Sequence, residues 1–223
     1  MAVELEARVA RIVEHAPDTR SLFLSGPRLG HRPGQFISCL LPVGDETIIR
    51  PYSIASDPED DLLEICLNVV PGGPGTAYLF ALGVGATVRF TGPWGTFVLD
   101  RAPDAEAVFI ADGTGIAPIR PMIRRALATA TGRAIRLLHA APPGTALVYG
   151  AEHARLAQEN AAFGFDRVPS ATLHADVVRR WIDADCDRTR RFFVCGVGAI
   201  VPALRDVLRR AGYERRAVQY EKW

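Results

Sequence analysis

Hydrophobic residues in the first hundred positions occur in short segments that clusters of Gly, Pro and Asp separate. Short apolar-rich segments at this spacing are typical of strands joined by turns, so this half predicts an antiparallel β-barrel or sandwich. One helix is expected over Gly75–Leu82, with Thr76 near its N-cap. The expected strands are Leu5–Val13, Thr19–Leu24, Phe36–Leu41, Leu62–Val70 and Thr87–Phe90.

The second half of the chain follows a different pattern, in which short apolar runs alternate with longer helix-forming stretches. Such alternation predicts a doubly wound α/β domain, with a parallel sheet and helices on both faces. Pro118 falls in the first turn of one expected helix, where proline is tolerated. The expected strands are Val108–Ala111, Ile135–His139 and Arg191–Cys195. The expected helices are Ile116–Ala130, Ala146–Glu159, Ala175–Asp183 and Ile200–Ala211, although Leu147–Tyr149 could also be briefly extended.

A polar, proline-containing stretch, Asp100–Asp104, separates the two patterns. The chain has 223 residues, enough for two domains of about 100 to 120 residues that each bury a core. We therefore expect an N-terminal antiparallel β-barrel domain over residues 1–101 and a C-terminal α/β domain over residues 102–223.

Composition narrows the class of protein. Apolar residues make up 48% of the chain and charged residues 23%, as in ordinary globular proteins. The net charge of +1 argues against nucleic-acid binding and against polybasic membrane binding. The sequence has neither an apolar run of about eighteen residues nor a signal-peptide core, so a cytoplasmic location is expected. The four cysteines are scattered without metal-ligand spacing, so we expect free thiols, no metal site and no iron–sulfur cluster.

Two glycine-rich segments stand where a helix begins. Gly113-Thr114-Gly115 follows the apolar run Ala107–Ala111, and Gly72–Thr76 opens the first expected helix. Glycines let the backbone approach a ligand closely, and a helix N-terminus offers free N–H groups and a positive dipole end to a phosphate. Each segment taken alone is equally compatible with a plain glycine-containing turn.

Three further segments carry candidate chemistry. In Arg50-Pro51-Tyr52-Ser53, the guanidinium could bind a phosphate, the phenol ring could lie along a planar cofactor, and the hydroxyl could hydrogen-bond a ring nitrogen; the alternative is an edge strand with an exposed Arg. Cys195-Gly196 ends the last expected strand, where doubly wound sheets bind ligands, although a buried structural cysteine is the commoner fate. Trp223 ends the chain, and its alternative is an ordinary core-capping residue.

The order and spacing of these motifs resemble the ferredoxin–NAD(P) reductase superfamily. An RxYS motif, a glycine-rich segment, a GTGxxP loop and a Cys-Gly strand end follow one another over nearly the whole chain. Pro33–Phe36, Gly92–Phe97 and the terminal Glu-Lys-Trp also match. The chain is similar to the flavin/NAD reductase module of bacterial ring-hydroxylating oxygenase reductases, without an iron–sulfur domain.

The resemblance implies an FAD-binding barrel and an NAD(P)-binding α/β domain. Arg50 would bind the flavin pyrophosphate, Ser53 would hydrogen-bond near flavin N5, and Trp223 would cover one flavin face until nicotinamide displaces it. Ser53, Cys195, Glu221 and Trp223 match the catalytic surroundings of the family. The implied flavin-binding residues are Arg50, Pro51, Tyr52, Ser53, Val69, Val70, Gly73, Gly75, Thr76 and Trp223. The implied nucleotide-binding residues are Gly113, Thr114, Gly115, Pro118, Cys195, Gly196 and Val197.

The implied function is a flavin-dependent oxidoreductase. Hydride would pass from NAD(P)H to bound FAD, and single electrons would pass on to a ferredoxin-like or other protein acceptor. FAD is favoured over FMN because the Gly72–Thr76 loop suits a pyrophosphate. Pro142 stands where NADPH users often have Arg, so NADH is favoured, and Asp112 stands where the family usually has glycine. Two alternatives stay open: an electron-transfer subunit of a larger complex, and a reductase that uses flavin as a diffusing substrate.

Overall fold

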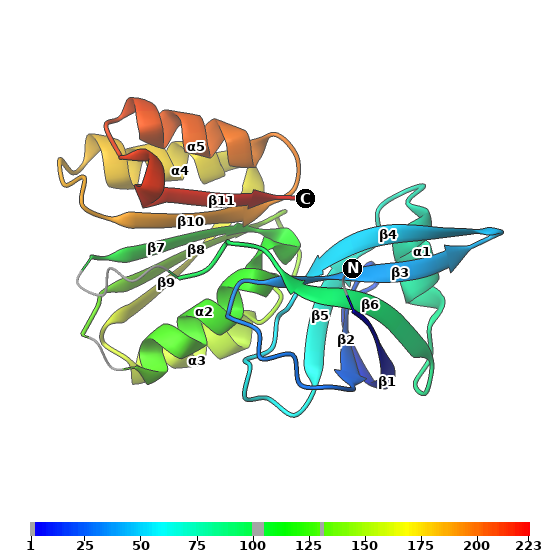
Figure 1. Ribbon diagram of the computed structural model, residues 1–223. Coiled ribbons are helices and arrows are strands. Elements are labelled where there is room, and N and C mark those ends of the chain that lie inside the picture. Colours follow the sequence, from blue (N-terminus) through cyan, green and yellow to red (C-terminus); the bar gives the residue numbers. More distant parts are fainter. Residues whose placement is uncertain (1–2, 100–104, 130–131) are drawn as a thin grey trace.

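Two sheets organise the chain in a computed structural model that describes residues 3–99, 105–129 and 132–223 (Figure 1). The first sheet lies in the N-terminal half and the second in the C-terminal half, as the two sequence patterns predict. The predicted boundary at Asp100–Asp104 lies outside the described residues, so the domain limits 1–101 and 102–223 stay a prediction.

The N-terminal sheet is antiparallel and curls into a barrel. Its strand order is β4-β3-β6-β1-β2-β5, and a bridge between Ile54 and Ile65 joins its two ends. Alternate residues of β1, β2, β3, β5 and β6 enter the core, and Leu79 of the helix α1 (Pro74–Ala81) packs there too. The strands are β1 (Glu4–Ala16), β2 (Thr19–Ser25), β3 (Phe36–Val43), β4 (Glu46–Ser53), β5 (Leu63–Asn68) and β6 (Thr87–Trp94).

The C-terminal sheet is parallel, with the order β11-β10-β7-β8-β9. The chain runs outward from β7 through β8 to β9 and then returns to the other side with β10 and β11, which is the doubly wound arrangement. This confirms the predicted fold class. The strands are β7 (Ala107–Asp112), β8 (Ile135–Ala141), β9 (Phe163–Pro169), β10 (Arg191–Gly196) and β11 (Val218–Lys222).

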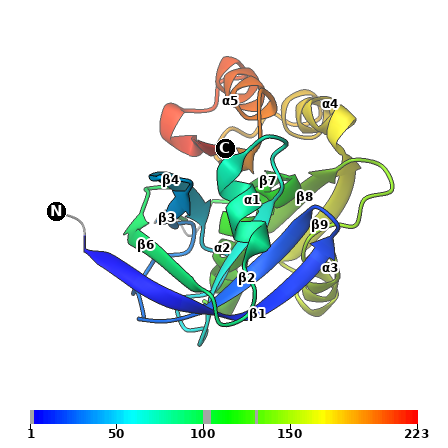
Figure 2. The ribbon, with the colours of Figure 1, turned by 90° about the vertical axis from the view of Figure 1, so that its right-hand side faces the viewer.

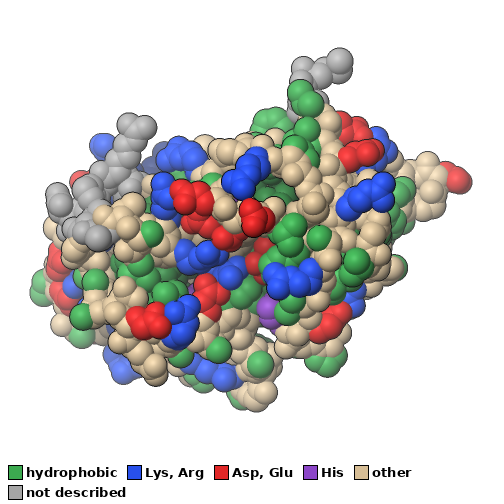
Figure 3. Space-filling model, turned by 90° about the horizontal axis from the view of Figure 1, so that it is seen from below, with side chains coloured by type: hydrophobic (Ala, Val, Ile, Leu, Met, Phe, Trp, Pro, Cys, Tyr) green, Lys and Arg blue, Asp and Glu red, His purple; other side chains and the backbone are tan. Residues whose placement is uncertain are grey.

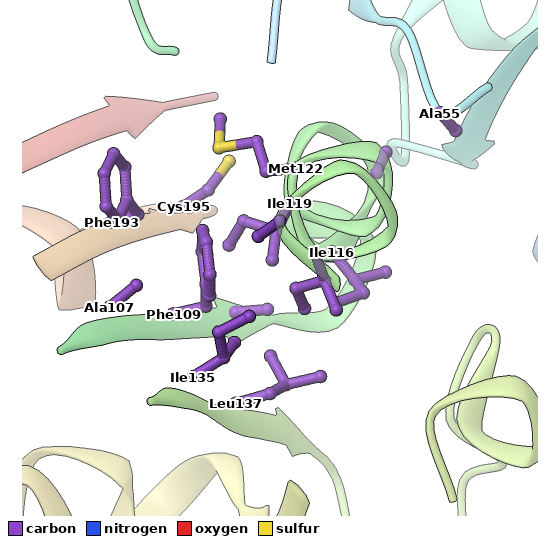
Figure 4. Close-up of a cluster of buried hydrophobic side chains, with 14 of the residues drawn as sticks. Ala55, Ala107, Phe109, Ile116, Ile119, Met122, Ile135, Leu137, Phe193 and Cys195 are labelled. Carbon is purple, nitrogen blue, oxygen red and sulfur yellow. The ribbon is translucent and has the colours of Figure 1, made fainter. Parts of the chain in front are cut away.

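Helices cover both faces of the parallel sheet because successive strand residues point to opposite sides. Phe109 and Phe193 pack against α2 (Ile116–Ala128), with α3 (Gly150–Glu159) beside it, as the close-up of this cluster shows (Figure 4). Val108 and Ile110 face the opposite side, where α4 (Leu173–Val178) and α5 (Ile200–Arg210) lie (Figure 1).

Three strands, β4, β9 and β11, were not expected from the sequence. Each lies at the edge of its sheet. β4 contains Arg50 and Pro51 and is mostly exposed, so it lacks the apolar alternation that marks a half-buried strand. The RPYS motif therefore lies in an edge strand, where Pro51 needs no N–H for the sheet. β11 contains the chain end and is held by parallel pairing with β10.

Three helices begin at residues other than those predicted from the sequence. Gly73, rather than Thr76, is the N-cap of α1; Thr76 Oγ1 instead donates to the Gly73 carbonyl oxygen at 3.1 Å and accepts the Val70 N–H at 3.1 Å. α3 begins only at Gly150, because Tyr149 has a left-handed φ of 59°. The helix expected over Ala175–Asp183 begins earlier, as α4, and ends in a π-helical turn over Arg179–Asp183.

Candidate functional site

The RPYS strand β4, α1 and the chain end lie near one another (Figure 2), and residues of all three line a cavity of about 550 Å³. Among the described residues that line it, Arg50 and Lys222 are cations and none is acidic. The cavity therefore suits an elongated, anionic ligand with an apolar body. Its lining residues are Arg50, Pro51, Tyr52, Ser53, Cys66, Leu67, Asn68, Val70, Gly73, Pro74, Gly75, Thr76, Thr114, Ala117, Val197, Lys222 and Trp223.

Gly75 and Arg50 form the part of this cavity suited to a phosphate. A Cβ added to Gly75 would lie 3.0 Å from Arg50 Cγ and 3.2 Å from Leu41 Cδ1, so only glycine lets the arginine stem lie across the helix start. The arginine stem therefore lies beside the N-terminus of α1, whose N–H groups carry a partial positive charge, while the guanidinium donates to the Ile49 carbonyl oxygen at 2.8 Å. Both the arginine and the helix start contribute positive potential to this part of the cavity.

Ser53 and Glu221 bring unsatisfied polar atoms to this region. Ser53 Oγ and Glu221 Oε2 are both buried without a hydrogen-bond partner of good geometry. Burial raises the pKa of Glu221 to about 7, an effect that the nearby Ser53 hydroxyl partly offsets. Buried polar atoms are normally paired, so an unpaired pair of this kind points to a missing ligand.

Val69 and Val70 present less free backbone than expected. The Val69 N–H donates to the Asp18 carbonyl at 2.7 Å, and the Val70 N–H donates to Thr76 Oγ1. Only Val70 lines the cavity. Neither residue therefore offers a free N–H to a flavin, and only their carbonyl oxygens have hydrogen-bonding capacity left.

A second cavity of about 400 Å³ lies against the Gly113–Gly115 turn, at the carboxyl end of β7. β7 and β10 are the neighbouring strands at which the strand order reverses, and ligands of doubly wound sheets bind outside this point. The turn packs tightly on the end of β10: a Cβ on Gly115 would lie 2.2 Å from the Cys195 carbonyl oxygen. Gly113 and Thr114 line the cavity, whereas Gly115, Pro118, Cys195 and Gly196 are buried behind it.

Two side chains that follow the parallel strands hold this turn. His139 Nε2 donates to the Gly113 carbonyl oxygen at 3.0 Å, and burial lowers the His139 pKa to about 4, so the ring is neutral near pH 7. Asp112, which faces the same cavity, accepts a 2.6 Å hydrogen bond from Ser170 Oγ. That hydrogen bond satisfies one of the carboxylate oxygens that would otherwise face a phosphate.

The two cavities meet. Asn68, Thr114 and Val197 line both of them, and Thr114 Oγ1 donates a 3.0 Å hydrogen bond to Asn68 Oδ1. Asn68 ends β5 of the barrel, whereas Thr114 follows β7 of the parallel sheet. Sequence reading missed Asn68, because nothing local distinguishes it from any polar residue at a strand end.

Trp223 and Cys195 lie next to this junction. The Trp223 N–H donates to the Gly196 carbonyl at 3.1 Å, and its ring packs edge-to-face on Phe36 with centroids 5.8 Å apart. The side chain is only partly buried and lines the larger cavity. Cys195 is 1% exposed; burial first, and the Glu221 carboxylate second, raise its thiol pKa well above the usual range. Its sulfur packs toward Met122 (Figure 4) as a neutral group.

Comparison with known proteins follows this division. Residues 6–99 match the family described as an oxidoreductase FAD-binding domain, and residues 109–206 match an oxidoreductase NAD-binding domain. The reductase subunit of an aromatic O-demethylase from Amycolatopsis is 30% identical over 99% of this chain and 69% of its own length. The chain belongs to the ferredoxin reductase superfamily. It is an FAD-dependent NAD(P)H oxidoreductase.

Other members of the superfamily match over their whole length. Ferredoxin–NADP reductase B of Sorangium cellulosum is 29% identical over all of this chain and 98% of its own. The crystal structure of a ferredoxin–NADP⁺ reductase from Neisseria gonorrhoeae, with bound FAD and NADP, superposes with a TM-score of 0.81 at 23% identity, over 100% of this chain and 99% of that one. The latter likeness concerns the fold.

Across residues 3–99, 105–129 and 132–223, no group of three or more His, Cys, Asp or Glu side chains is placed to hold a metal ion. Within the same ranges, no helix has both the length and the apolar character that crossing a membrane requires.

Proposed function

We propose that this chain passes reducing equivalents from NAD(P)H, through FAD bound on the barrel, to a ferredoxin-like or other one-electron protein acceptor. When bound, FAD accepts a hydride and releases electrons one at a time. The observation that carries the proposal is the junction at Asn68 and Thr114, where a cationic cavity on the barrel meets the cavity of the parallel sheet. We assign residues 1–101 to the flavin and residues 102–223 to the nucleotide.

The residues of the larger cavity fit FAD. Arg50 and the N–H groups at Gly75 and Thr76 would hold the pyrophosphate, because the glycine cradle lets the arginine stem lie at the helix start. Tyr52 would pack on the ring and ribityl chain, with Pro51 holding the strand edge. The unpaired Ser53 Oγ would hydrogen-bond the ring near N5. Gly73 and Val70 would complete the cradle.

The smaller cavity fits a nicotinamide nucleotide. The free N–H groups of the Gly113–Gly115 turn would bind its pyrophosphate, with Pro118 starting α2 and His139 fixing the turn. Gly196, which ends β10, and Val197, just past it, would let the nicotinamide approach the flavin. Cys195, buried and neutral, would support that face by packing rather than by acid–base chemistry.

Trp223 would compete with nicotinamide for the flavin face. Replacing Trp223 with alanine is therefore expected to tighten nicotinamide stacking about tenfold, since an aromatic pair is worth roughly 0.5–1.5 kcal/mol. Titration of the oxidised protein with NAD⁺ or NADP⁺, followed by charge-transfer absorbance, measures the change. Trp223→Phe is the control, because it keeps an aromatic ring. Unchanged affinity and absorbance in the alanine variant would count against this role.

The choice between NADH and NADPH depends on one cation that sequence reading overlooked. Pro142 offers no charge to a 2′-phosphate, and on this ground we propose NADH as the preferred donor. Folding nevertheless places Arg167 of β9 against Thr145, which lines the nucleotide cavity: Arg167 Nη2 donates to the Thr145 carbonyl at 2.5 Å. Arg167 is then the cation that would bind the 2′-phosphate of NADPH.

Arg167→Ala is accordingly expected to weaken NADPH binding about tenfold while leaving NADH binding nearly unchanged, because only NADPH carries the 2′-phosphate. Binding isotherms for both nucleotides check this, and Arg167→Lys, which keeps the charge, serves as the control. Equal losses for the two nucleotides would show that Arg167 does not reach the 2′ position.

Anaerobic stopped-flow reduction of the purified protein by NADH and by NADPH tests the proposed function. We expect FAD to stay bound through gel filtration and to be reduced by at least one donor. Loss of flavin on the column would instead favour a reductase that uses flavin as a diffusing substrate. A stable stoichiometric complex on co-purification would favour an electron-transfer subunit.

A further inference from the structure

Three arginines of α2 reach across the domain interface to acidic residues of the barrel. Arg120 pairs with Glu64, Arg124 with Asp60 and Arg125 with Glu59. In the view from below, basic and acidic side chains gather around a hollow between the two domains (Figure 3). A cavity of about 750 Å³ lies here, on the side away from the cofactor cavities, and Arg120 and Arg124 line it.

Arg120 differs from its two neighbours in burial. Its side chain is 15% exposed and that of Glu64 only 2%, whereas Arg124 and Arg125 are 32% and 50% exposed. Exposed ion pairs contribute little to structure because water screens them, while buried pairs hold a fixed geometry. The Arg120 pair is therefore the one that can set how the domains lie relative to each other.

The guanidinium of Arg120 is bound on all sides. Nη1 donates to Glu64 Oε2 at 2.6 Å and to the Ala55 carbonyl at 3.0 Å, and Nε donates to Glu152 at 2.8 Å. The Tyr149 ring lies under it at 4.3 Å, and the Tyr149 hydroxyl donates to Glu64 Oε1 at 2.7 Å. Glu64, a barrel residue, thus accepts hydrogen bonds from two elements of the nucleotide domain.

These contacts join segments of the chain that lie within a few residues of the two cofactor motifs. Ala55 lies two residues after Ser53, and Figure 4 shows it against α2. Arg120 lies in the second turn of α2, directly after the Gly113–Gly115 turn. Glu64 sits on β5, whose last residue, Asn68, joins the two cavities. A shift at Arg120 would therefore move one motif relative to the other.

We propose that Arg120, Glu64 and Tyr149, here called the interdomain clamp, are positioning residues that fix the nicotinamide site against the flavin site. The clamp rests on the proposed function and deepens it. The clamp residues line neither cofactor cavity. They act through the Ala55 carbonyl and the start of α2. Loss of the clamp should slow hydride transfer without weakening the binding of either cofactor to its own domain.

The test compares two double variants of the FAD-loaded protein. Arg120→Met/Glu64→Gln removes both buried charges together, so neither is left unpaired, and Arg125→Met/Glu59→Gln makes the same change at an exposed interdomain pair. Tyr149→Phe removes a single hydroxyl and serves if the clamp variant does not fold. Anaerobic mixing with NADH and NADPH gives the limiting rate constant of reduction. Titrations give the charge-transfer absorbance and the affinities for FAD and for ADP-ribose, which lacks the nicotinamide.

For the clamp variant we expect the limiting rate to fall at least about tenfold, with weaker charge-transfer absorbance and with FAD and ADP-ribose affinities within about twofold of wild type. Tyr149→Phe should show the same pattern at about two- to fivefold, and the exposed-pair variant should match wild type. Equal rates and absorbance in the clamp and exposed-pair variants would overturn the proposed clamp but not the proposed function.

A loss of FAD or ADP-ribose affinity that parallels the loss of rate would also overturn the clamp, in favour of a general structural role. A wild-type protein that neither nucleotide reduces would overturn the proposed function and the clamp with it.

Discussion

Replacing Gly115 with alanine is expected to lower the rate of flavin reduction by either nicotinamide nucleotide by about 100-fold or more, while FAD stays bound. A Cβ at this position would lie 2.2 Å from the Cys195 carbonyl oxygen and 2.5 Å from its carbon, and both are backbone atoms. Backbone cannot rotate away as a side chain can, so either the start of α2 or the end of β10 must move. Overpacking of this kind costs about 1–3 kcal/mol or more.

Gly113→Ala provides the matched control for this effect. Gly113 has a φ of +55°, but a Cβ there would meet nothing within 4 Å. The substitution therefore carries only a conformational cost of about 1–2 kcal/mol. Gly115 is the reverse case, with an α-helical φ of −58° and a severe contact. Stopped-flow reduction and thermal unfolding of both variants separate the two costs. Near-wild-type reduction in Gly115→Ala would show that the strand end relaxes around an added methyl group.

The sequence predicts the fold class because both domains bury regular patterns. The barrel strands alternate inward and outward residues, and the central parallel strands are continuous apolar runs between helices. The edge strands escape prediction because their pairing is set by a distant neighbour. Among the strands that the structure describes, β4 pairs with β3 alone and the terminal β11 with β10 alone. Neither needs an apolar pattern of its own.

The candidate site divides in the same way. Motifs that carry local chemistry, such as Arg50–Ser53 and Gly113–Gly115, are visible in the sequence, and the structure brings them to adjoining cavities. Residues whose role depends on a partner far away in the sequence could not be predicted. Asn68 hydrogen-bonds Thr114, Arg167 hydrogen-bonds Thr145, and Arg120 hydrogen-bonds Glu64. Arg120 follows the GTGxxP motif by only two residues, yet only the fold shows that it crosses to the barrel.

The limiting rate of flavin reduction is expected to be highest below pH 7 and to fall about tenfold as the pH rises through 7. Burial raises the pKa of Glu221 to about 7, and the nearby Ser53 hydroxyl stabilises its carboxylate form. Below pH 7 the protonated carboxyl leaves the Ser53 hydroxyl free to donate to the flavin ring. Above pH 7 the carboxylate takes that hydrogen bond, and the loss of one such bond is worth roughly 1–1.5 kcal/mol.

Two variants distinguish this mechanism from other titrations. Glu221→Gln should flatten the pH profile at the high rate, since a neutral amide does not draw the Ser53 hydroxyl away as a carboxylate does. Ser53→Ala should flatten it at the low rate. A profile in Glu221→Gln that still titrates near pH 7 would assign the ionisation to another group. Rates at saturating nucleotide, measured from pH 5 to about pH 9 around the perturbed pKa, decide between these results.

The same ionisation makes folding stability depend on pH in a defined direction. The folded protein binds the Glu221 proton more tightly than the unfolded chain, whose carboxyl has the ordinary pKa of 4.5. The stabilisation of the wild type relative to Glu221→Gln is therefore largest below pH 4.5 and is lost as the pH rises from 4.5 to about 7. A shift of this size corresponds to at most about 3 kcal/mol. Urea unfolding of both proteins across this window measures it, and a difference that grows with pH would contradict burial as the cause of the raised pKa.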